Sequence, residues 1–420
     1  MIYFIIGDNM RKLFCTFLFV LIFNLLITNV NALELDVNSK NAIIYNLNDD
    51  TVLYEKKSDE KISIASMTKI MTAIVAIENI NSLDDKITLT YADFYGLAEA
   101  NAAVAGFYVD EVVTYRDLLY GLLLPSGADA AQALTRNISG GRENFVNLMN
   151  KKAQEIGLIN THFVNETGLD AYNHYSTVLD VASMFKYALK NDEFKKIIES
   201  KEYTTSDGYL TMVSTISKNT KRYGLEMDYL LGGKTGTTDD AGLCLASIAS
   251  KDNVNYMLVT ARATYDRYTP FNFYDAQKIY EYFMNNYSYK NVVDKKDLIL
   301  TLDTLYAKED KVDFYSNIKL DKYLSNDFNK EDLVYDYKGI KIIDTKMEKG
   351  TKLGVLNISY NDKIFTSIDI ILDHELEFDL KKYIDVHKKE IIIIGSSSLF
   401  GLILFVFMII LIRKKAKKNK

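Results

Sequence analysis

The sequence has very little cysteine, proline and tryptophan. Its 420 residues contain two cysteines, two prolines and no tryptophan. Cys15 lies in an apolar segment near the N-terminus, so the remainder of the chain holds only Cys244. This excludes a disulfide framework and a cysteine-based metal site within one chain. Cys244 stands in an apolar run, residues 242–246, and is predicted to be a small buried residue.

The chain also lacks an excess of positive charge and any metal-binding pattern. It has 50 Lys and Arg against 56 Asp and Glu, a net charge of −6, and no basic stripe with interleaved aromatic residues. A nucleic-acid partner is therefore not expected. His162 and His174 lie in a predicted loop, residues 160–177, without the spacing of metal ligands. We predict no metal and no cofactor, and interpret both as hydrogen-bonded loop residues.

The first 32 residues have the features of a secretory signal peptide. Arg11 and Lys12 form a basic start, residues 13–28 are mostly apolar, and Val30-Asn31-Ala32 matches a signal-peptidase site. The alternative is an anchor helix that is not cleaved. Either interpretation predicts export of the chain that follows.

A second apolar segment lies near the C-terminus. Residues 391–412 carry no charge, and at about 1.5 Å per residue they span roughly 30 Å, the hydrocarbon thickness of a bilayer. The tail that follows, 413–420, is strongly basic and is expected to stay in the cytoplasm. We predict a single-pass protein of the cell membrane with residues 33–390 outside the cytoplasm.

Two domains are predicted between these ends. Residues 33–287 combine strand-like and helical segments and indicate an α/β domain with an antiparallel sheet packed between helices. Its last strands are expected within 230–261, and a helix over 271–287 closes it. Residues 288–385 alternate hydrophobic and polar residues, which predicts a smaller β-rich domain.

The segment 63–77 carries the strongest chemical signal. Between Met67 and Glu78 its only charge is Lys69, so a helix here is apolar on every side and is predicted to be buried. A buried ammonium must be paired or have a lowered pKa. Ser66 lies three residues earlier, on the same face, beside unpaired backbone N–H groups of the helix start. This combination suits a nucleophilic serine with a lysine base.

The serine–lysine spacing alone does not show that Ser66 is a nucleophile. Ser58–Lys61, Ser183–Lys186 and Ser316–Lys319 share it, although none of them opens so apolar a helix. A helix-capping Ser66 with an extended Lys69 side chain is the alternative at this point.

Two later motifs stand in segments that can reach a cleft. Ser126 follows Pro125, which ends a helix, and precedes the helical segment 130–137. It is either a cleft residue or a helix N-cap. Lys234-Thr235-Gly236-Thr237 lies in the first of the predicted late strands.

In order, Ser66-x-x-Lys69, Ser126-Gly127-Ala128 and Lys234-Thr235-Gly236 resemble the motif set of serine β-lactamases and penicillin-binding proteins. More closely, the chain resembles low-molecular-mass penicillin-binding proteins that are D-alanyl-D-alanine carboxypeptidases. The likeness extends over about residues 42–287 and includes the flanking runs 64–73, 117–123, 161–165, 168–169 and 233–237.

The resemblance implies a role for each motif residue. Ser66 would attack the carbonyl of the penultimate D-alanine and form an acyl-enzyme, Lys69 would take its proton, and Ser126 would relay a proton to the leaving nitrogen. It further implies that Lys234, with Thr235 and Thr237, binds the terminal carboxylate. Gly236 would allow close approach of the peptide to the strand, and the N–H groups of Ser66 and Thr237 would form the oxyanion hole.

The implied partners are peptidoglycan stem peptides ending in D-Ala-D-Ala, β-lactam antibiotics and the membrane. One departure stands out, because Ala128 occupies the place of the family's usual Asn. We expect the adjacent Asp129 to compensate in part. Two alternatives stay open: a β-lactamase with Glu166 as deacylation base, and a wall-binding protein of weak activity.

Overall fold

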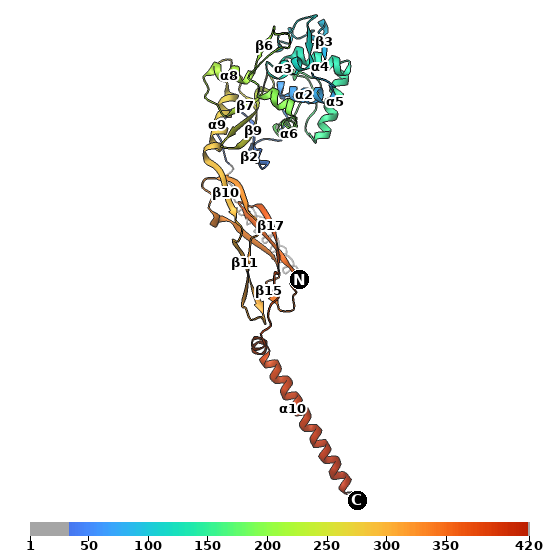
Figure 1. The fold of residues 1–420 in the computed structure, drawn as a ribbon, viewed down its shortest axis with the longest axis vertical. Helices are drawn as coiled ribbons and strands as arrows, with labels where there is room; N and C mark the ends of the chain where they lie inside the picture. Colours follow the sequence, from blue (N-terminus) through green and yellow to red (C-terminus); the bar gives the residue numbers. More distant parts are fainter. Residues whose placement is uncertain (1–32, 419–420) are drawn as a thin grey trace, which may run out of the picture. The chain divides into compact units, whose positions relative to one another are not determined.

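The computed structural model describes residues 33–418, so the predicted signal peptide lies outside the described residues. The chain divides into two compact units, Met1–Asn285 and Asn286–Lys420 (Figure 1). The domain limits predicted from the sequence pattern, 33–287 and 288–385, stay predictions.

A five-stranded antiparallel sheet forms the centre of the first unit. Its strand order is β2-β1-β9-β8-β7. The strands are β1 (Asn41–Asn46), β2 (Thr51–Lys56), β7 (Leu230–Thr238), β8 (Gly242–Lys251) and β9 (Val254–Ala263). Strand β7, which carries the Lys-Thr-Gly motif, is therefore an edge strand of this sheet.

Both faces of the sheet are covered by helices, as predicted. On one face Cys244 and Ala246 of β8 join the large core that contains α2 (Thr68–Asn79) and α6 (Val178–Ala188). On the other face Ser247 of β8 is hydrogen-bonded to Tyr280 of α9 (Phe271–Asn286), with 3.0 Å between their hydroxyl oxygens. Burial on both faces explains why β8 and β9 are apolar in consecutive positions rather than alternating. The helices are α2 (Thr68–Asn79), α3 (Tyr115–Leu123), α4 (Ala128–Ser139), α5 (Arg142–Ile156), α6 (Val178–Ala188), α7 (Asp192–Glu199), α8 (Thr215–Tyr223) and α9 (Phe271–Asn286).

Short elements connect these helices. They are the 3-10 turns η1 (Ala65–Met67) and η2 (Tyr91–Asp93) and the two-stranded pairs β3 (Lys86–Thr88) with β4 (Val112–Thr114) and β5 (Glu202–Thr204) with β6 (Thr211–Val213).

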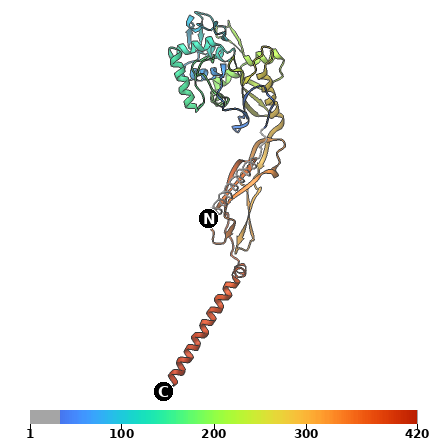
Figure 2. The ribbon, with the colours of Figure 1, turned by 180° about the vertical axis from the view of Figure 1, so that it is seen from behind.

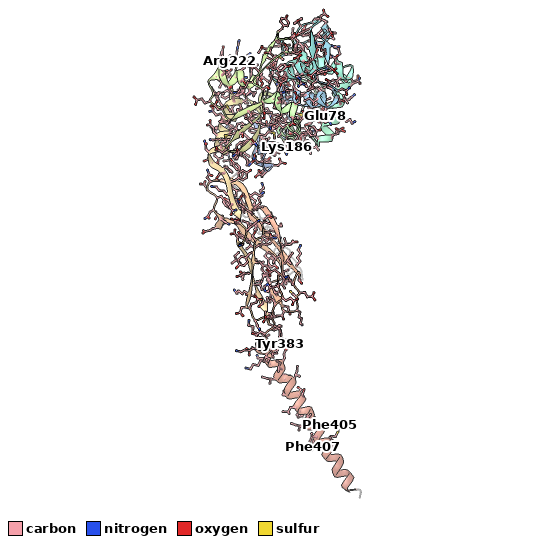
Figure 3. All side chains as sticks on the ribbon, in the orientation of Figure 1. Glu78, Lys186, Arg222, Tyr383, Phe405 and Phe407 are labelled. Carbon is pink, nitrogen blue, oxygen red and sulfur yellow. The ribbon has the colours of Figure 1, made fainter. Side chains whose placement is uncertain are left out.

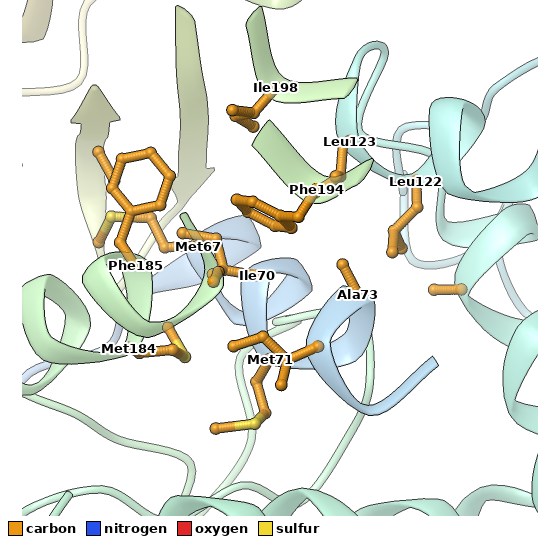
Figure 4. Packing of buried hydrophobic residues seen from close by; sticks show 14 of the residues in the cluster. Met67, Ile70, Met71, Ala73, Leu122, Leu123, Met184, Phe185, Phe194 and Ile198 are labelled. Atoms are coloured by element: carbon orange, nitrogen blue, oxygen red, sulfur yellow. The ribbon is translucent and has the colours of Figure 1, made fainter. Parts of the chain in front are cut away.

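Helix α2 is buried on all sides, as its apolar sequence predicted. Its residues from Thr68 to Ala76 are buried. Figure 4 shows Ile70 and Met71 among side chains from neighbouring elements, including Phe185 of α6 and Phe194 of α7. The expected helix start at Ser66 is corrected, because Ser66 lies in η1 and α2 begins at Thr68. The serine therefore sits on a tight turn ahead of a rigid helix.

The second unit is β-rich, as predicted. Its sheets have the strand orders β10-β13, β12-β11-β15 and β14-β16-β17, and share a core that includes Val292, Leu302, Ile343 and Leu356. The elements are β10 (Tyr287–Val293), β11 (Leu298–Leu305), β12 (Lys311–Tyr315), β13 (Leu320–Ser325), η3 (Lys330–Asp332), β14 (Val334–Gly339), β15 (Ile342–Asp344), β16 (Lys352–Tyr360) and β17 (Lys363–Ile371).

The chain continues into a single long helix, α10 (Leu380–Lys418), which is uninterrupted in both views (Figure 2). Residues Leu380–Ile409 are long and apolar enough to cross a membrane, and their most apolar window is not buried against protein. The helix begins eleven residues before the predicted apolar segment 391–412. Its first turns are charged and pack on the β-rich unit, which a search for apolar runs does not detect.

Candidate active site

Ser66 and Lys69 are in direct contact. The Nζ atom of Lys69 donates to Oγ of Ser66 at 3.0 Å and to the backbone oxygen of Thr167 at 2.6 Å. Lys69 is only 2% exposed. Burial lowers its pKa from 10.5 to about 8, although the carboxylates of Glu166 and Asp129 act in the opposite direction. The amine is therefore a base placed on a hydroxyl, which is the arrangement that a serine nucleophile requires.

Two glycines allow the backbone to pack closely around the turn that carries Ser66. A Cβ atom at Gly168 would lie 2.0 Å from the backbone oxygen of Ala65. A Cβ atom at Gly236 would lie 3.0 Å from the Cβ of Ala65 and 3.1 Å from the backbone nitrogen of Ser66. Gly236 was expected to make room for a bound peptide, and the structure gives it a second neighbour, the turn of Ser66. The edge strand thus lies against the N–H group of Ser66.

Ser126 and Lys234 form a second serine–lysine pair. Nζ of Lys234 donates to Oγ of Ser126 at 2.8 Å and to the backbone oxygen of Thr235 at 2.8 Å. Lys234 is fully buried, and burial, together with the charge of Lys69, lowers its pKa well below 10.5. Ser126 has a φ of +70°, a conformation that non-glycine residues adopt rarely and often at functional sites. Its alternative interpretation as an N-cap is wrong, because Gly127 is the N-cap of α4.

The threonines of β7 differ in their surroundings. The hydroxyl of Thr235 donates to that of Thr215, at the start of α8, at 3.0 Å. Thr237 is exposed. Both belong to the edge strand, whose second side has no neighbouring strand among the described residues. The predicted site residues therefore lie on η1, in the first turn of α2, on the turn before α4 and along β7.

Glu166 is already engaged with another residue. Its carboxylate accepts hydrogen bonds from Nε and Nη2 of Arg142 at 2.9 and 3.0 Å, and the residue is 1% exposed. Its backbone oxygen accepts from the Thr72 hydroxyl at 2.7 Å. A buried carboxylate that is paired in this way holds the loop 160–177 in place. This disfavours the β-lactamase alternative, which needs Glu166 as a free base.

The same loop contributes positions that sequence reasoning did not select. Thr167 supplies the backbone oxygen that holds Lys69. His174 accepts from the backbone N–H of Val164 with Nδ1 at 3.2 Å, and its Nε2 lies 2.9 Å from the hydroxyl of Thr68. Burial lowers the pKa of His174 to about 4, so it stays neutral at physiological pH. It is a hydrogen-bonded loop residue, as predicted.

Asp129 does not take over the role of the Asn that the resemblance leads us to expect at position 128. The Asp129 carboxylate accepts from the backbone N–H of Ala105 at 2.8 and 3.0 Å and of Gly106 at 3.2 Å. Ala128 is buried, and its N–H donates to the backbone oxygen of Ala103. The expected compensation by Asp129 is therefore not supported, because its oxygens already hold the neighbouring loop.

Comparison with known proteins gives a consistent picture. Residues 28–264 match the model of the family Peptidase_S11, described as D-alanyl-D-alanine carboxypeptidase. The chain is 36% identical over 239 residues to D-alanyl-D-alanine carboxypeptidase DacF of Bacillus subtilis, covering 55% of this chain and 59% of that protein. It is 37% identical over 216 residues to the D-alanyl-D-alanine carboxypeptidase of Streptomyces sp. strain K15, covering 48% of this chain and 72% of that protein.

Solved structures show the same fold. The Streptomyces K15 DD-transpeptidase aligns with a TM-score of 0.54 and 31% identity, over 60% of this chain and 98% of that chain. Penicillin binding protein 5 from Haemophilus influenzae aligns with a TM-score of 0.60 over 82% of this chain and 99% of that chain. At 22% identity the second match concerns the fold alone. The predicted fold class is confirmed.

Proposed function

Because the chain belongs to the Peptidase_S11 family of D-alanyl-D-alanine carboxypeptidases, we propose that it removes the terminal D-alanine from peptidoglycan pentapeptides through an acyl-enzyme. The observation that carries this proposal is the 3.0 Å contact between Nζ of a buried Lys69 and Oγ of Ser66. It supplies both the nucleophile and a base whose pKa, about 8, is close to physiological pH.

Acylation begins with the attack of Ser66 Oγ on the carbonyl carbon of the penultimate D-alanine. Lys69 takes the hydroxyl proton, and the proton passes through Ser126 to the leaving D-alanine nitrogen. The N–H groups of Ser66 and Thr237 stabilise the oxyanion. The close approach of Gly236 to the Ser66 nitrogen supports this assignment, since it holds β7 beside that N–H group.

The free carboxylate of the substrate's terminal D-alanine is bound by Lys234, Thr235 and Thr237. Among the described residues, Lys234 donates to two neutral oxygens, those of Ser126 and Thr235, and burial lowers its pKa. A bound carboxylate raises that pKa, because an opposite charge favours the ammonium form. The carboxylate-binding site therefore becomes positively charged when the substrate binds. A penicillin, which carries a carboxylate and a reactive carbonyl, meets the same groups and acylates Ser66.

The direct test measures D-alanine release from a pentapeptide ending in D-Ala-D-Ala, together with covalent labelling by a fluorescent penicillin. Ser66→Ala is expected to abolish both. Ser183→Ala is the matched control, because Ser183 and Lys186 have the same spacing but Ser183 donates to the backbone oxygen of Leu179. Labelling that survives Ser66→Ala, or is lost in Ser183→Ala, contradicts the assignment.

A second measurement separates this proposal from a β-lactamase. Glu166→Gln is expected to lower stability while the half-life of the penicillin acyl-enzyme stays unchanged, because the Glu166 carboxylate is paired with Arg142. A β-lactamase that uses Glu166 as its deacylation base would accumulate acyl-enzyme in this variant, and its wild-type form would hydrolyse penicillin with rapid turnover.

The membrane location is part of the same proposal. The apolar helix α10 anchors the chain, and the basic tail, 413–420, stays in the cytoplasm. The catalytic residues are then held outside the cytoplasm, where peptidoglycan lies.

A further inference from the structure

A pocket of about 490 Å³ adjoins the loop 160–177 and is not used by the mechanism proposed above. Its walls are formed by α4, by the turn between α4 and α5, by residues 92–97 and by the loop itself. A pocket of this volume is large enough for a small ligand or a long side chain. Its place relative to the catalytic residues follows from the contacts of the loop.

Leu169 connects the pocket to the active site. It lines the pocket, and the residues on either side of it contact the catalytic elements. Gly168 packs against the turn that carries Ser66. The carboxylate of Asp170 accepts a hydrogen bond from the hydroxyl of Thr238, at the end of β7, at 2.7 Å. The wall of the pocket at Leu169 is therefore one residue away from contacts with both the turn of Ser66 and the end of β7.

The direction of the substrate along β7 leads to the same place. In the proposed mechanism the terminal carboxylate lies at Lys234 and Thr235, and the scissile carbonyl faces the N–H of Thr237. A peptide beside an edge strand advances by about 3.3 Å per residue. The residue before D-Ala-D-Ala therefore comes level with Thr238, and it is the first whose side chain can be long enough to enter the pocket. In peptides bound at a sheet edge, such pockets give specificity.

The polar groups of the pocket favour a ligand that accepts hydrogen bonds. Both carboxylates in its walls are already paired, Asp93 with Arg136 at 2.7 and 2.8 Å and Glu166 with Arg142. Donors remain available. The hydroxyl of Thr135, which is 3% exposed, has no hydrogen-bond partner among the described residues. Arg142 uses Nε and Nη2 for Glu166, and within the described part of the chain its Nη1 is not engaged.

We infer that this pocket binds the side chain of the residue before D-Ala-D-Ala and selects a long side chain that ends in a carboxylate. The aliphatic part packs on Leu97 and Leu169, and the carboxylate accepts from Thr135 and Arg142. A side chain that ends in an ammonium group finds both carboxylates of the pocket already paired. Diaminopimelate, with its second carboxylate, meets the requirement, whereas lysine does not. The inference rests on the proposed carboxypeptidase function and names the part of the stem peptide that sets its specificity.

The test measures the specificity constant for D-alanine release from acetyl-X-D-Ala-D-Ala with the full-length protein. X is L-2-aminopimelate, L-lysine or L-norleucine, whose long unbranched side chains end in a carboxylate, an ammonium and a methyl group. The aminopimelate peptide is expected to exceed each of the others at least about fivefold, because it alone accepts the hydrogen bonds of the pocket. The net charge of the protein is −6, so a general attraction for anions does not explain such a preference.

A pair of threonine variants assigns the preference to the pocket. Thr135→Val removes the hydroxyl with little change of shape, and is expected to lower the ratio of aminopimelate to norleucine at least about threefold. Thr220→Val is the matched control and is expected to keep the native ratio. Thr220 is also a helical threonine, but its hydroxyl donates to the backbone oxygen of Ile216 at 3.1 Å. Its helix α8, marked by Arg222 in Figure 3, lies across the first unit from α5 (Figure 1).

The possible failures can be told apart. Equal specificity constants for the three peptides would overturn the inference and leave the proposed function standing. The same holds for a native preference that Thr135→Val does not change. Absence of D-alanine release from all three peptides would refute the carboxypeptidase function, and the inference with it.

Discussion

Lys69 is the residue whose protonation sets the rate of acylation. Its pKa is lowered to about 8, and only the neutral amine accepts the Ser66 proton. The second-order rate of acylation by a penicillin is therefore expected to rise about tenfold from pH 6 to pH 7 and to level off above about pH 8. Stopped-flow measurement across this range checks the profile. A rate independent of pH between 6 and 8 would show that Lys69 is not the base.

Ala128 provides a second test at the level of single residues. Because Asp129 is bound to Ala105 and Gly106, Asn at position 128 is expected to add a hydrogen bond to the substrate amide. One such bond is worth about 1–3 kcal/mol, or roughly 5- to 150-fold in the specificity constant for D-alanine release. Ala128→Ser, which adds less volume to this buried position, controls for crowding.

The outcome also decides how active the native protein is. A native enzyme that releases D-alanine, and improves in Ala128→Asn, is a working carboxypeptidase with one contact missing. A native protein without activity, which gains large activity in Ala128→Asn, would instead be the weakly active wall-binding protein considered as an alternative.

Among the elements, the loop 160–177 and the turn η1 depend on each other through Gly168. Gly168 has a φ of +80° and no room for a Cβ atom, whereas Gly208 has a φ of +82° and nothing within 4 Å of its Cβ position. Gly208→Ala is expected to lose about 1–2 kcal/mol of unfolding free energy from backbone strain, with normal acylation. Gly168→Ala is expected to lose more and to be acylated at least about tenfold more slowly, because the turn of Ser66 must move. Urea unfolding and penicillin labelling measure both, and equal losses in the two variants would contradict this coupling.

The elements also show which parts of the site local sequence can predict. Ser66 and Lys69 lie three residues apart, so the short turn η1 and the first turn of α2 bring them together locally, and the apolar sequence of α2 predicts its burial. The contact of Lys234 with Ser126 joins positions 108 residues apart, and only the family resemblance indicated it. The Thr167 oxygen and the Arg142 partner of Glu166 carry no local signal, since a backbone carbonyl has no side-chain identity and a surface arginine resembles many others.

At the scale of the whole molecule, the orientation across the membrane is open to a direct test. Protease added to intact cells stripped of their wall is expected to remove the catalytic unit and to leave the basic tail 413–420 protected, because positively charged flanks stay in the cytoplasm. Antibodies against one tag inserted just after the predicted cleavage site and another at the C-terminus follow the two fragments. Protection of the catalytic unit would reverse the proposed orientation, and detergent-treated cells provide the control in which both ends are digested.

The reactivity of Cys244 reports how often the core beside the catalytic strand β7 opens. Cys244 is the one cysteine of residues 33–418, it is 0% exposed, and it pairs with Gly236 across β7 and β8. Burial raises its thiol pKa to about 12, and its side chain lies in the core that contains α2 and α6, so a thiol reagent reacts only after the catalytic unit opens at this core. The labelling rate of the native protein therefore measures how often this opening occurs. A peptide bound along the free edge of β7 should lower that rate.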